Sequence, residues 1–518
     1  MGGLFKEALL PVELFWRLLD KRHTGLIIAL SFCAIQFSIR LLAFENLDVD
    51  EAEVYLFPQS WQLLYELRHP PLQIWIMKAV LALTGDDPIG INIWKYGALA
   101  GGLYAYYRAA YVLLESRALA CVALLALLDT QTVRGAMHPH LSYSVILGAV
   151  ISLSLLFLLW ALKGGRNSDW VWLGVWLSFG LWTKYIFLFL VACFATAIAA
   201  IPDLRARVSR RAALAIAGIV ALQSLITFGL AAIAKYSVTG LAVQLLQGGP
   251  RQARPSLIAP VWQMARAIWE FGGIVCAPFV PMANLIFGRA SSSESNSFAA
   301  NGARMIGLGC ALALAGFLVF SVASHATWVR SQWLYPFLML FPIALVYWSS
   351  RGVVPDLRMK AAALVLAAGA VLFIGFRIWG FTQPRSVCND CAVYSPLQMM
   401  AHQLKANGFT EGTIIAPHYE LAGNFRIAFR TSRIIAASVG PQAFGPVRSA
   451  PSKYILVWLG TEAPPEMRPY VQRALGLPGV KRGVIEVPRT ERLNTRLSYV
   501  MVTLPTEIWP NPITGETQ

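Results

Sequence analysis

The chain has 518 residues, of which 57% are hydrophobic and only 14% are charged. Its mean hydropathy of +0.56 and its recurring long apolar runs exclude a soluble domain and indicate a polytopic membrane protein. The formal charge of +16 is typical of membrane proteins, which gather Lys and Arg in their inner loops, so no nucleic-acid partner is expected.

The N-terminal segment carries Lys6, Arg17, Lys21 and Arg22 before an apolar stretch without a small-residue cleavage site. This pattern predicts a retained anchor with a cytoplasmic N-terminus. The apolar segments that follow predict about eleven membrane spans. They cover residues 24–44, 91–113, 118–133, 141–162, 170–183, 184–200, 212–234, 266–288, 305–323, 332–350 and 361–381. Residues 72–84 are shorter, as in an interfacial or re-entrant helix.

The first predicted outer loop begins with a cluster of carboxylates, at Asp48, Asp50, Glu51 and Glu53. Asp48 and Glu53, taken singly, are predicted to be solvated. A carboxylate beside a span should face water or a cavity, because lipid does not solvate its charge. The prolines of "RHPP" favour extended backbone and return the chain to the membrane surface. Such a loop can hold a general base over a membrane-embedded substrate.

Several cationic or histidine residues fall in other predicted outer loops. They are Arg134, His138 and His140 in "TVRGAMHPHLSYS", Lys184 beside Tyr185 in "GLWTKYIFLFL", and Arg330 in "SHATWVRSQWLYPF". Singly, each could be a membrane anchor or a structural residue. Together with Asp50 they supply a base and cations at one membrane depth, which suits a lipid phosphate leaving group.

An odd number of spans places residues 382–518 outside the membrane. Short apolar runs such as "TIIA" and "KYILVWL" alternate there with amphipathic stretches, a pattern that predicts a small α/β domain. The expected domains are therefore a transmembrane unit, 1–381, and an extracytoplasmic unit, 382–518.

Two cysteines, Cys388 and Cys391, lie just past the last predicted span. We expect a structural disulfide, since no thioredoxin-like unit surrounds this Cys-x-x-Cys motif. A zinc site there would need two more ligands, and neither HExxH nor DxD occurs in the chain. No cofactor is therefore expected to be required, and a divalent metal at the outer histidines and carboxylates remains an alternative.

Four segments in this order resemble the membrane glycosyltransferases of family 39, which share the GT-C fold with protein O-mannosyltransferases and the lipid A aminoarabinose transferase. The segments are "DVDEAEVY…RHPPLQIW", "RGAMHPHLSYSVIL", "GLWTKYIFLFL" and "RSQWLYPFLMLFPIAL". The resemblance covers about residues 25–350. The branch with the greatest likeness contains the rhizobial lipopolysaccharide galacturonosyltransferases.

The resemblance implies a sugar donor on a polyprenyl phosphate and an acceptor hydroxyl on a lipid, glycan or protein outside the bacterial cytoplasmic membrane. Asp50 matches the family's catalytic aspartate, with Glu51 beside it, in a catalytic loop at 45–90. Arg68, His69, Lys184, Tyr185 and Arg330 match donor-binding positions. Attack would invert the anomeric centre and expel polyprenyl phosphate.

The chain departs from the family after the third span, where His138 or His140 stands at a position that is usually acidic. We assign Arg134, His138 and His140 to acceptor binding or to support of the first loop. A monomer is expected. The alternatives are a flippase or transporter of lipid-linked sugars, a protein O-glycosyltransferase, and a non-catalytic scaffold. Transporters often carry inverted repeats, and the sequence has no evident repeat, so the enzyme interpretation is favoured.

Overall fold

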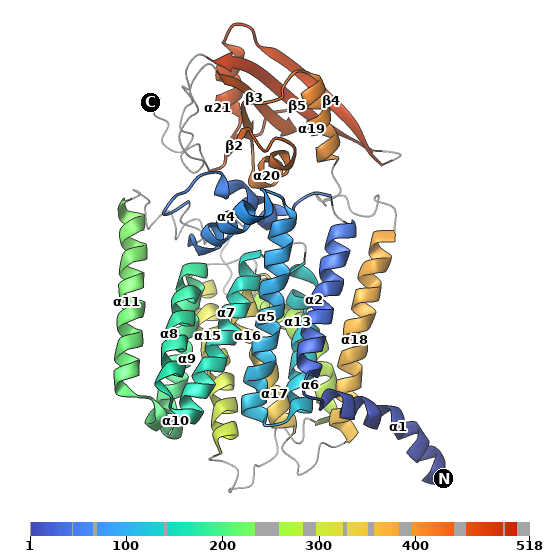
Figure 1. Ribbon diagram of the computed structural model, residues 1–518, viewed down its shortest axis with the longest axis vertical. Coiled ribbons are helices and arrows are strands. Elements are labelled where there is room, and N and C mark those ends of the chain that lie inside the picture. Colours follow the sequence, from blue (N-terminus) through green and yellow to red (C-terminus); the bar gives the residue numbers. More distant parts are fainter. Residues whose placement is uncertain are drawn as a thin grey trace.

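The computed structural model describes residues 2–43, 45–65, 70–138, 142–233, 258–282, 297–324, 329–350, 357–382, 396–439, 452–490 and 493–504. These ranges form a helical bundle with a small α/β domain stacked on one end (Figure 1). The predicted fold class is confirmed in this coarse form.

Helices occupy nearly every predicted apolar segment, because unbroken apolar runs satisfy their own backbone hydrogen bonds only as helices in lipid. The long helices are α2 (Thr24–Ala43), α5 (Ile89–Leu114), α6 (Arg117–Leu128), α7 (Ser142–Gly164), α8 (Asn167–Thr183), α9 (Ile186–Ala200), α11 (Arg210–Ile233), α13 (Ile258–Cys276), α15 (Phe298–Ala323) and α18 (Leu357–Thr382). The short helix α10 (Pro202–Arg207) closes the end of the bundle away from the sheet (Figure 1).

Within the described ranges, four helical segments are both long and apolar enough to span a membrane: 24–43, 143–164, 298–323 and 357–379. The total of about eleven spans stays a prediction. The segment 72–84 forms a single helix, α4 (Leu72–Thr84), which lies between the bundle and the sheet (Figure 1).

Two parts of the bundle differ from the sequence prediction. The segment 332–350 is not one helix but three short pieces, η4 (Ser331–Leu334), α16 (Tyr335–Leu338) and α17 (Phe341–Ser349). Pro336 and Pro342 stand near the starts of α16 and α17, where proline is tolerated, whereas inside a continuous helix each would remove a backbone donor. The structure also has an N-terminal helix, α1 (Gly2–Leu19), ahead of the first apolar segment.

The C-terminal domain has the predicted alternation of strands and helices. Its sheet has the order β2-β1-β3-β5-β4, parallel on the β2-β1-β3 side and antiparallel on the β3-β5-β4 side. The strands are β1 (Thr413–Ala416), β2 (Arg433–Ala436), β3 (Ser452–Leu459), β4 (Lys481–Thr490) and β5 (Leu493–Leu504). The accompanying helices are α19 (Leu397–Ala406), α20 (Tyr419–Ala428) and α21 (Arg468–Leu475).

The apolar core divides into two clusters. The first fills the helical bundle. The second combines the sheet with the first loop, joining Leu56 and Phe57 to core residues such as Phe425 and Ile434. The loop therefore buries its apolar side chains against the C-terminal domain, and this shared core holds the loop over the end of the bundle.

Candidate active site

The acidic cluster of the first loop forms a short helix, α3 (Val49–Leu56). Asp48 caps its N-terminus in a capping box, in which Glu51 reaches back to the cap backbone. Successive residues on a helix point about 100° apart, so Asp50 and Glu51 face different surroundings. Glu51 is fully buried, whereas Asp50 is partly exposed.

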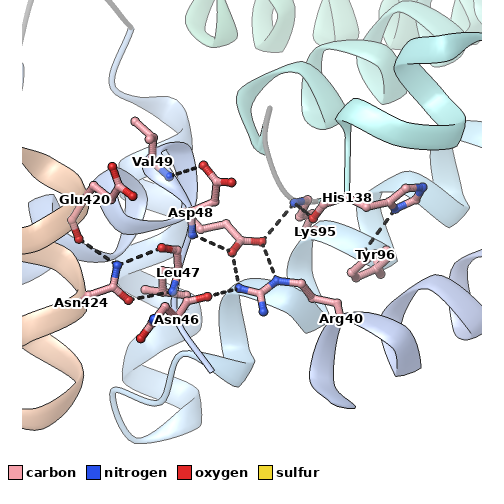
Figure 2. Close-up of polar contacts among 11 residues, drawn as sticks. Arg40, Asn46, Leu47, Asp48, Val49, Lys95, Tyr96, His138, Glu420 and Asn424 are labelled. Atoms are coloured by element: carbon pink, nitrogen blue, oxygen red, sulfur yellow. Dashed lines mark hydrogen bonds and ion pairs between the residues drawn. The ribbon is translucent and has the colours of Figure 1, made fainter. Parts of the chain in front are cut away.

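Glu51 lies between two buried cations. Its Oε2 is 2.5 Å from Arg40 Nη2, and its Oε1 is 3.1 Å from Lys95 Nζ (Figure 2). Lys95 also donates to the backbone oxygen of His138 over 2.7 Å. The carboxylate thus joins α3 to α2 and α5 and, through Lys95, to the segment before α7.

Burial by itself would raise the pKa of the Glu51 carboxyl, but the charges of Lys95 and Arg40 and their hydrogen bonds outweigh it and lower the pKa below its ordinary value of 4.5. Glu51 is therefore an anion at neutral pH. With both oxygens bonded to cations, it is arranged to hold charge in place.

Asp50 differs from Glu51 in its contacts. Within the described part of the chain, no hydrogen bond or ion pair is formed by the Asp50 carboxylate. Its charge acts on Lys95 through space. A partly exposed carboxylate beside a rigid, charged cluster can accept a proton from a bound hydroxyl group, as a general base must.

Asp48 and Glu53 are not solvated, contrary to the prediction for each taken singly, because both are buried. Asp48 is used as the helix cap. Glu53 accepts a hydrogen bond of 2.7 Å from the hydroxyl of Tyr143, at the start of α7. Three of the four carboxylates, Asp48, Glu51 and Glu53, are therefore buried with hydrogen-bond partners inside the protein.

Lys184 lies in the predicted tight turn, between the end of α8 and the start of α9. The turn can be tight because Gly180 has no side chain, so the ring of Phe187 occupies the space where a Cβ would stand. Lys184 Nζ is 3.1 Å from the hydroxyl of Ser144. Since Ser144 follows Tyr143, the start of α7 joins Lys184 to α3. Asp50 and Lys184 therefore lie at the same end of the bundle.

Arg330 and Arg134 also belong to this end. Arg330 is exposed and precedes η4, and Ser331 in η4 bonds Gln131 over 3.4 Å. That contact brings Arg330 near the π-helical turn η2 (Thr132–Ala136), which contains Arg134. The guanidinium of Arg134 lies 4.9 Å from the ring centroid of Phe373.

His138 is fully buried and stacks on Tyr96, with ring centroids 5.8 Å apart. Its Nδ1 is 3.3 Å from the Tyr96 hydroxyl (Figure 2). Burial, with the nearby charges of Arg377 and Lys95, lowers the pKa of His138 well below its ordinary value. His138 is therefore neutral at physiological pH and supports the packing behind the first loop.

Some predicted site residues lie outside the described ranges: Arg68, His69, His140, Cys388 and Cys391. The predicted disulfide and the roles of these residues stay predictions. In the part that is described, no cluster of three potential metal ligands occurs. Because His69 and His140 fall outside it, the expected absence of a required metal also stays a prediction.

Sequence reasoning missed Arg40 and Lys95, the two partners of Glu51. Lys95 gave a usable signal, because it interrupts the apolar segment 91–113, and a charge within a span needs a partner or a cavity. Arg40, near the end of α2, gave no comparable signal, because long cationic side chains are common at the ends of spans. Its partner comes from a helix that the hydropathy pattern does not define.

Comparison with known proteins agrees with this architecture. Residues 68–245 match the family model described as dolichyl-phosphate-mannose-protein mannosyltransferase. The chain is 26% identical over 487 residues to the lipopolysaccharide core galacturonosyltransferase RgtB of Rhizobium johnstonii, covering 90% of this chain and 95% of that protein. It is 25% identical over 459 residues to RgtA of the same organism, covering 85% and 87%.

The crystal structure of ArnT from Cupriavidus metallidurans in the apo state matches with a TM-score of 0.57 and 12% sequence identity, over 92% of this chain and 98% of that one. This likeness establishes the shared fold. The family match and the two relatives confirm the resemblance found in the sequence: residues 68–245 are similar to the dolichyl-phosphate-mannose-protein mannosyltransferases, and most of the chain is similar to lipopolysaccharide core galacturonosyltransferases.

Proposed function

We propose that the chain is an inverting glycosyltransferase that moves a sugar from a polyprenyl-phosphate donor to a hydroxyl of an envelope lipid or glycan. The relatives are lipopolysaccharide core galacturonosyltransferases, so galacturonic acid is the proposed sugar and lipopolysaccharide core or lipid A the proposed acceptor. The transfer would take place at the periplasmic face of the bacterial inner membrane.

One observation carries the proposal. A partly exposed carboxylate, Asp50, adjoins the buried ion pairs of Glu51, and Lys184 lies at the same end of the bundle. A base held on a rigid helix can deprotonate a hydroxyl, and a nearby cation can stabilise a departing phosphate.

In the proposed step, Asp50 accepts the proton as the acceptor oxygen attacks the anomeric carbon. The bond from that carbon to the phosphate oxygen breaks, and polyprenyl phosphate leaves as an anion. Lys184 and Arg330 stabilise its charge, with Arg68, His69 and Tyr185 proposed to complete the donor site. Glu51 contributes by holding Arg40 and Lys95 behind Asp50.

The membrane arrangement is part of the proposal. The chain would cross the inner membrane about eleven times, with a cytoplasmic N-terminus, a periplasmic domain at 382–518 and a single copy as the working unit. The path of two helices supports this arrangement. Helix α8 runs from the end of the bundle near α10 to the turn at Lys184, and α9 runs back, so the Lys184 turn and α10 lie at opposite ends (Figure 1). Basic residues are also abundant near α10, at Arg205, Arg207, Arg210 and Arg211.

The test is transfer of radiolabelled sugar from polyprenyl-phosphate galacturonic acid to lipopolysaccharide, with Asp50→Asn beside the wild type. We expect transfer to fall at least about 100-fold, the usual contribution of a general base. Asp20→Asn is the matched control, because Asp20 is exposed before α2, at the opposite end of that helix. Full transfer by Asp50→Asn would remove Asp50 from the base role.

The acceptor is identified by mass spectrometry of envelope lipids from a deletion strain, since the missing mass names sugar and acceptor together. A missing lipopolysaccharide species supports the proposal. Unchanged lipids with an altered glycoprotein would identify a protein O-glycosyltransferase. Lipid-linked sugar accumulating on the cytoplasmic side would favour a flippase.

A further inference from the structure

Helix α20 of the C-terminal domain touches α3 backbone to backbone. A Cβ placed on Gly423 would lie 2.5 Å from the backbone oxygen of Ala52 and 2.7 Å from its Cα. Such distances leave no room for a side chain, so glycine at 423 permits this approach. The helix that carries Asp50 is therefore packed directly against the C-terminal domain.

The next residue, Asn424, forms the polar part of this contact. Its side chain is fully buried. Its Oδ1 accepts from the Leu47 N–H over 2.7 Å, and its Nδ2 donates to the Leu47 oxygen over 2.8 Å (Figure 2). The same Nδ2 also lies 2.8 Å from the Glu420 oxygen. The amide thus pairs with the Leu47 peptide groups as a neighbouring strand would.

Leu47 is the middle of three consecutive residues that are each held by a different element. The Asn46 oxygen accepts from Arg40 Nη2 over 2.9 Å. The backbone N–H of Asp48 is directed at Glu51 within the capping box. Asn424, which lies in the C-terminal domain, fixes Leu47 through its two hydrogen bonds to the Leu47 backbone. The segment that leads into α3 and ends at its N-cap, two residues before Asp50, is therefore set jointly by α2, by α3 itself and by α20.

The far end of α3 is tied to the same domain. The guanidinium of Arg426 lies 4.5 Å from the ring centroid of Tyr55 and donates to the Tyr55 backbone oxygen and to Asp86. Just beyond α3, Gln59 exchanges two hydrogen bonds of 2.9 Å with the backbone of Ile434, at the edge of the sheet. Both ends of α3 are therefore fixed from the C-terminal domain.

We propose that Asn424 is a positioning residue for glycosyl transfer: its amide fixes the start of α3 and thereby the direction in which Asp50 faces the acceptor. The inference rests on the proposed function of Asp50. We expect Asn424 to act through α3 and not at the donor phosphate, because its side chain bonds Leu47 and Glu420, whereas Lys184 bonds Ser144. The C-terminal domain is then part of the catalytic unit, because its helix α20 carries Asn424 and packs against α3.

The test compares Asn424→Ala with Asn407→Ala in the full-length protein. Asn407 is exposed after α19 in the same domain, so it gives the same chemical change away from α3. We expect kcat for transfer from polyprenyl-phosphate galacturonic acid to fall about 10- to 100-fold in Asn424→Ala, because small misplacements of a catalytic group have effects of that size. Binding of undecaprenyl phosphate should be unchanged, and Asn407→Ala should match the wild type.

A second variant disturbs the same contact by another route. Gly423→Ala places a methyl group against Ala52, and we expect the same loss of kcat with undecaprenyl phosphate binding retained. Wild-type kcat in both variants would overturn the proposal. So would a parallel fall in kcat, undecaprenyl phosphate binding and the thermal midpoint of the full-length protein, since that result identifies a purely structural contact.

Asp50→Asn separates this inference from the proposed function. In an Asp50→Asn background, adding Asn424→Ala should produce little further loss, because both changes act on one group. Wild-type kcat in Asp50→Asn would contradict the function proposed for Asp50, that of general base. An inactive Asp50→Asn beside a fully active Asn424→Ala would leave that function standing and overturn only the positioning role.

Discussion

The Glu51 cluster and the Lys184 turn lie at the same end of the bundle but are built differently. Glu51 is fully buried with a cation at each oxygen, whereas Lys184 is half-buried and bonds a neutral hydroxyl over 3.1 Å. A buried carboxylate paired with two cations is suited to hold geometry. A half-buried ammonium group is suited to meet an incoming anion.

Glu51→Gln is expected to have the largest effect, and it tests whether the Glu51 cluster holds the geometry of this region. The change leaves Arg40 and Lys95 buried beside a neutral group, and removing one partner of a buried ion pair typically costs about 3–5 kcal/mol. We expect a large fall in the thermal midpoint of the detergent-solubilised protein and loss of transfer with it. A stable Glu51→Gln protein lacking only transfer would instead give Glu51 a direct part in the chemistry.

Lys184→Ala tests the other side of the comparison. We expect undecaprenyl phosphate to bind about 10- to 100-fold more weakly, because a hydrogen bond to a charged group typically contributes about 1.5–3 kcal/mol. The thermal midpoint should hardly move. Lys163→Ala is the matched control, since its pair with Glu115 is exposed and such pairs contribute little. Unchanged binding in Lys184→Ala would refute the donor-phosphate assignment.

Acid pH sharpens the comparison without mutation. The pKa of Glu51 is lowered by folding, so the native state binds fewer protons than the unfolded state near the ordinary value. Its contribution to stability is present above pH 4.5 and is lost as pH falls through the lowered native value. At pH values below 4.5 we expect the thermal midpoint of the wild type to decrease. The thermal midpoint of Glu51→Gln should depend less on pH in this range. If the thermal midpoints of the wild type and Glu51→Gln change equally with pH, Glu51 is not the source of the acid sensitivity.

The smallest effect is expected for Tyr143→Phe, at the junction of the two regions. Losing the hydroxyl takes one donor from buried Glu53, and a typical hydrogen bond contributes about 1 kcal/mol. We expect a small fall in the thermal midpoint and unchanged binding of undecaprenyl phosphate. Weakened binding would show that Tyr143 belongs functionally to the Lys184 turn.

The comparison also explains which residues were predictable. Asp50 and Lys184 stand out because each is a polar residue at the border of an apolar segment, and the resemblance assigns roles to both. Arg40, Lys95 and Asn424 lacked such roles. Arg40 is 11 positions from Glu51, Lys95 is 44, and Asn424 is 377 from Leu47. No local periodicity encodes partners at those separations.

Composition and apolar run length by themselves determined that this chain is a helical membrane protein. Backbone N–H and C=O groups cannot bond water in lipid, and an apolar run satisfies them within itself only as a helix. The alternation of short β runs with amphipathic stretches determined the small C-terminal domain. Only the tertiary structure decided that the first loop shares its core with that domain, and that Glu51 faces inward while Asp50 does not. Those outcomes depend on which side chains, distant in the sequence, can pair with a buried charge or bond a buried peptide group. These partners meet only when the chain folds.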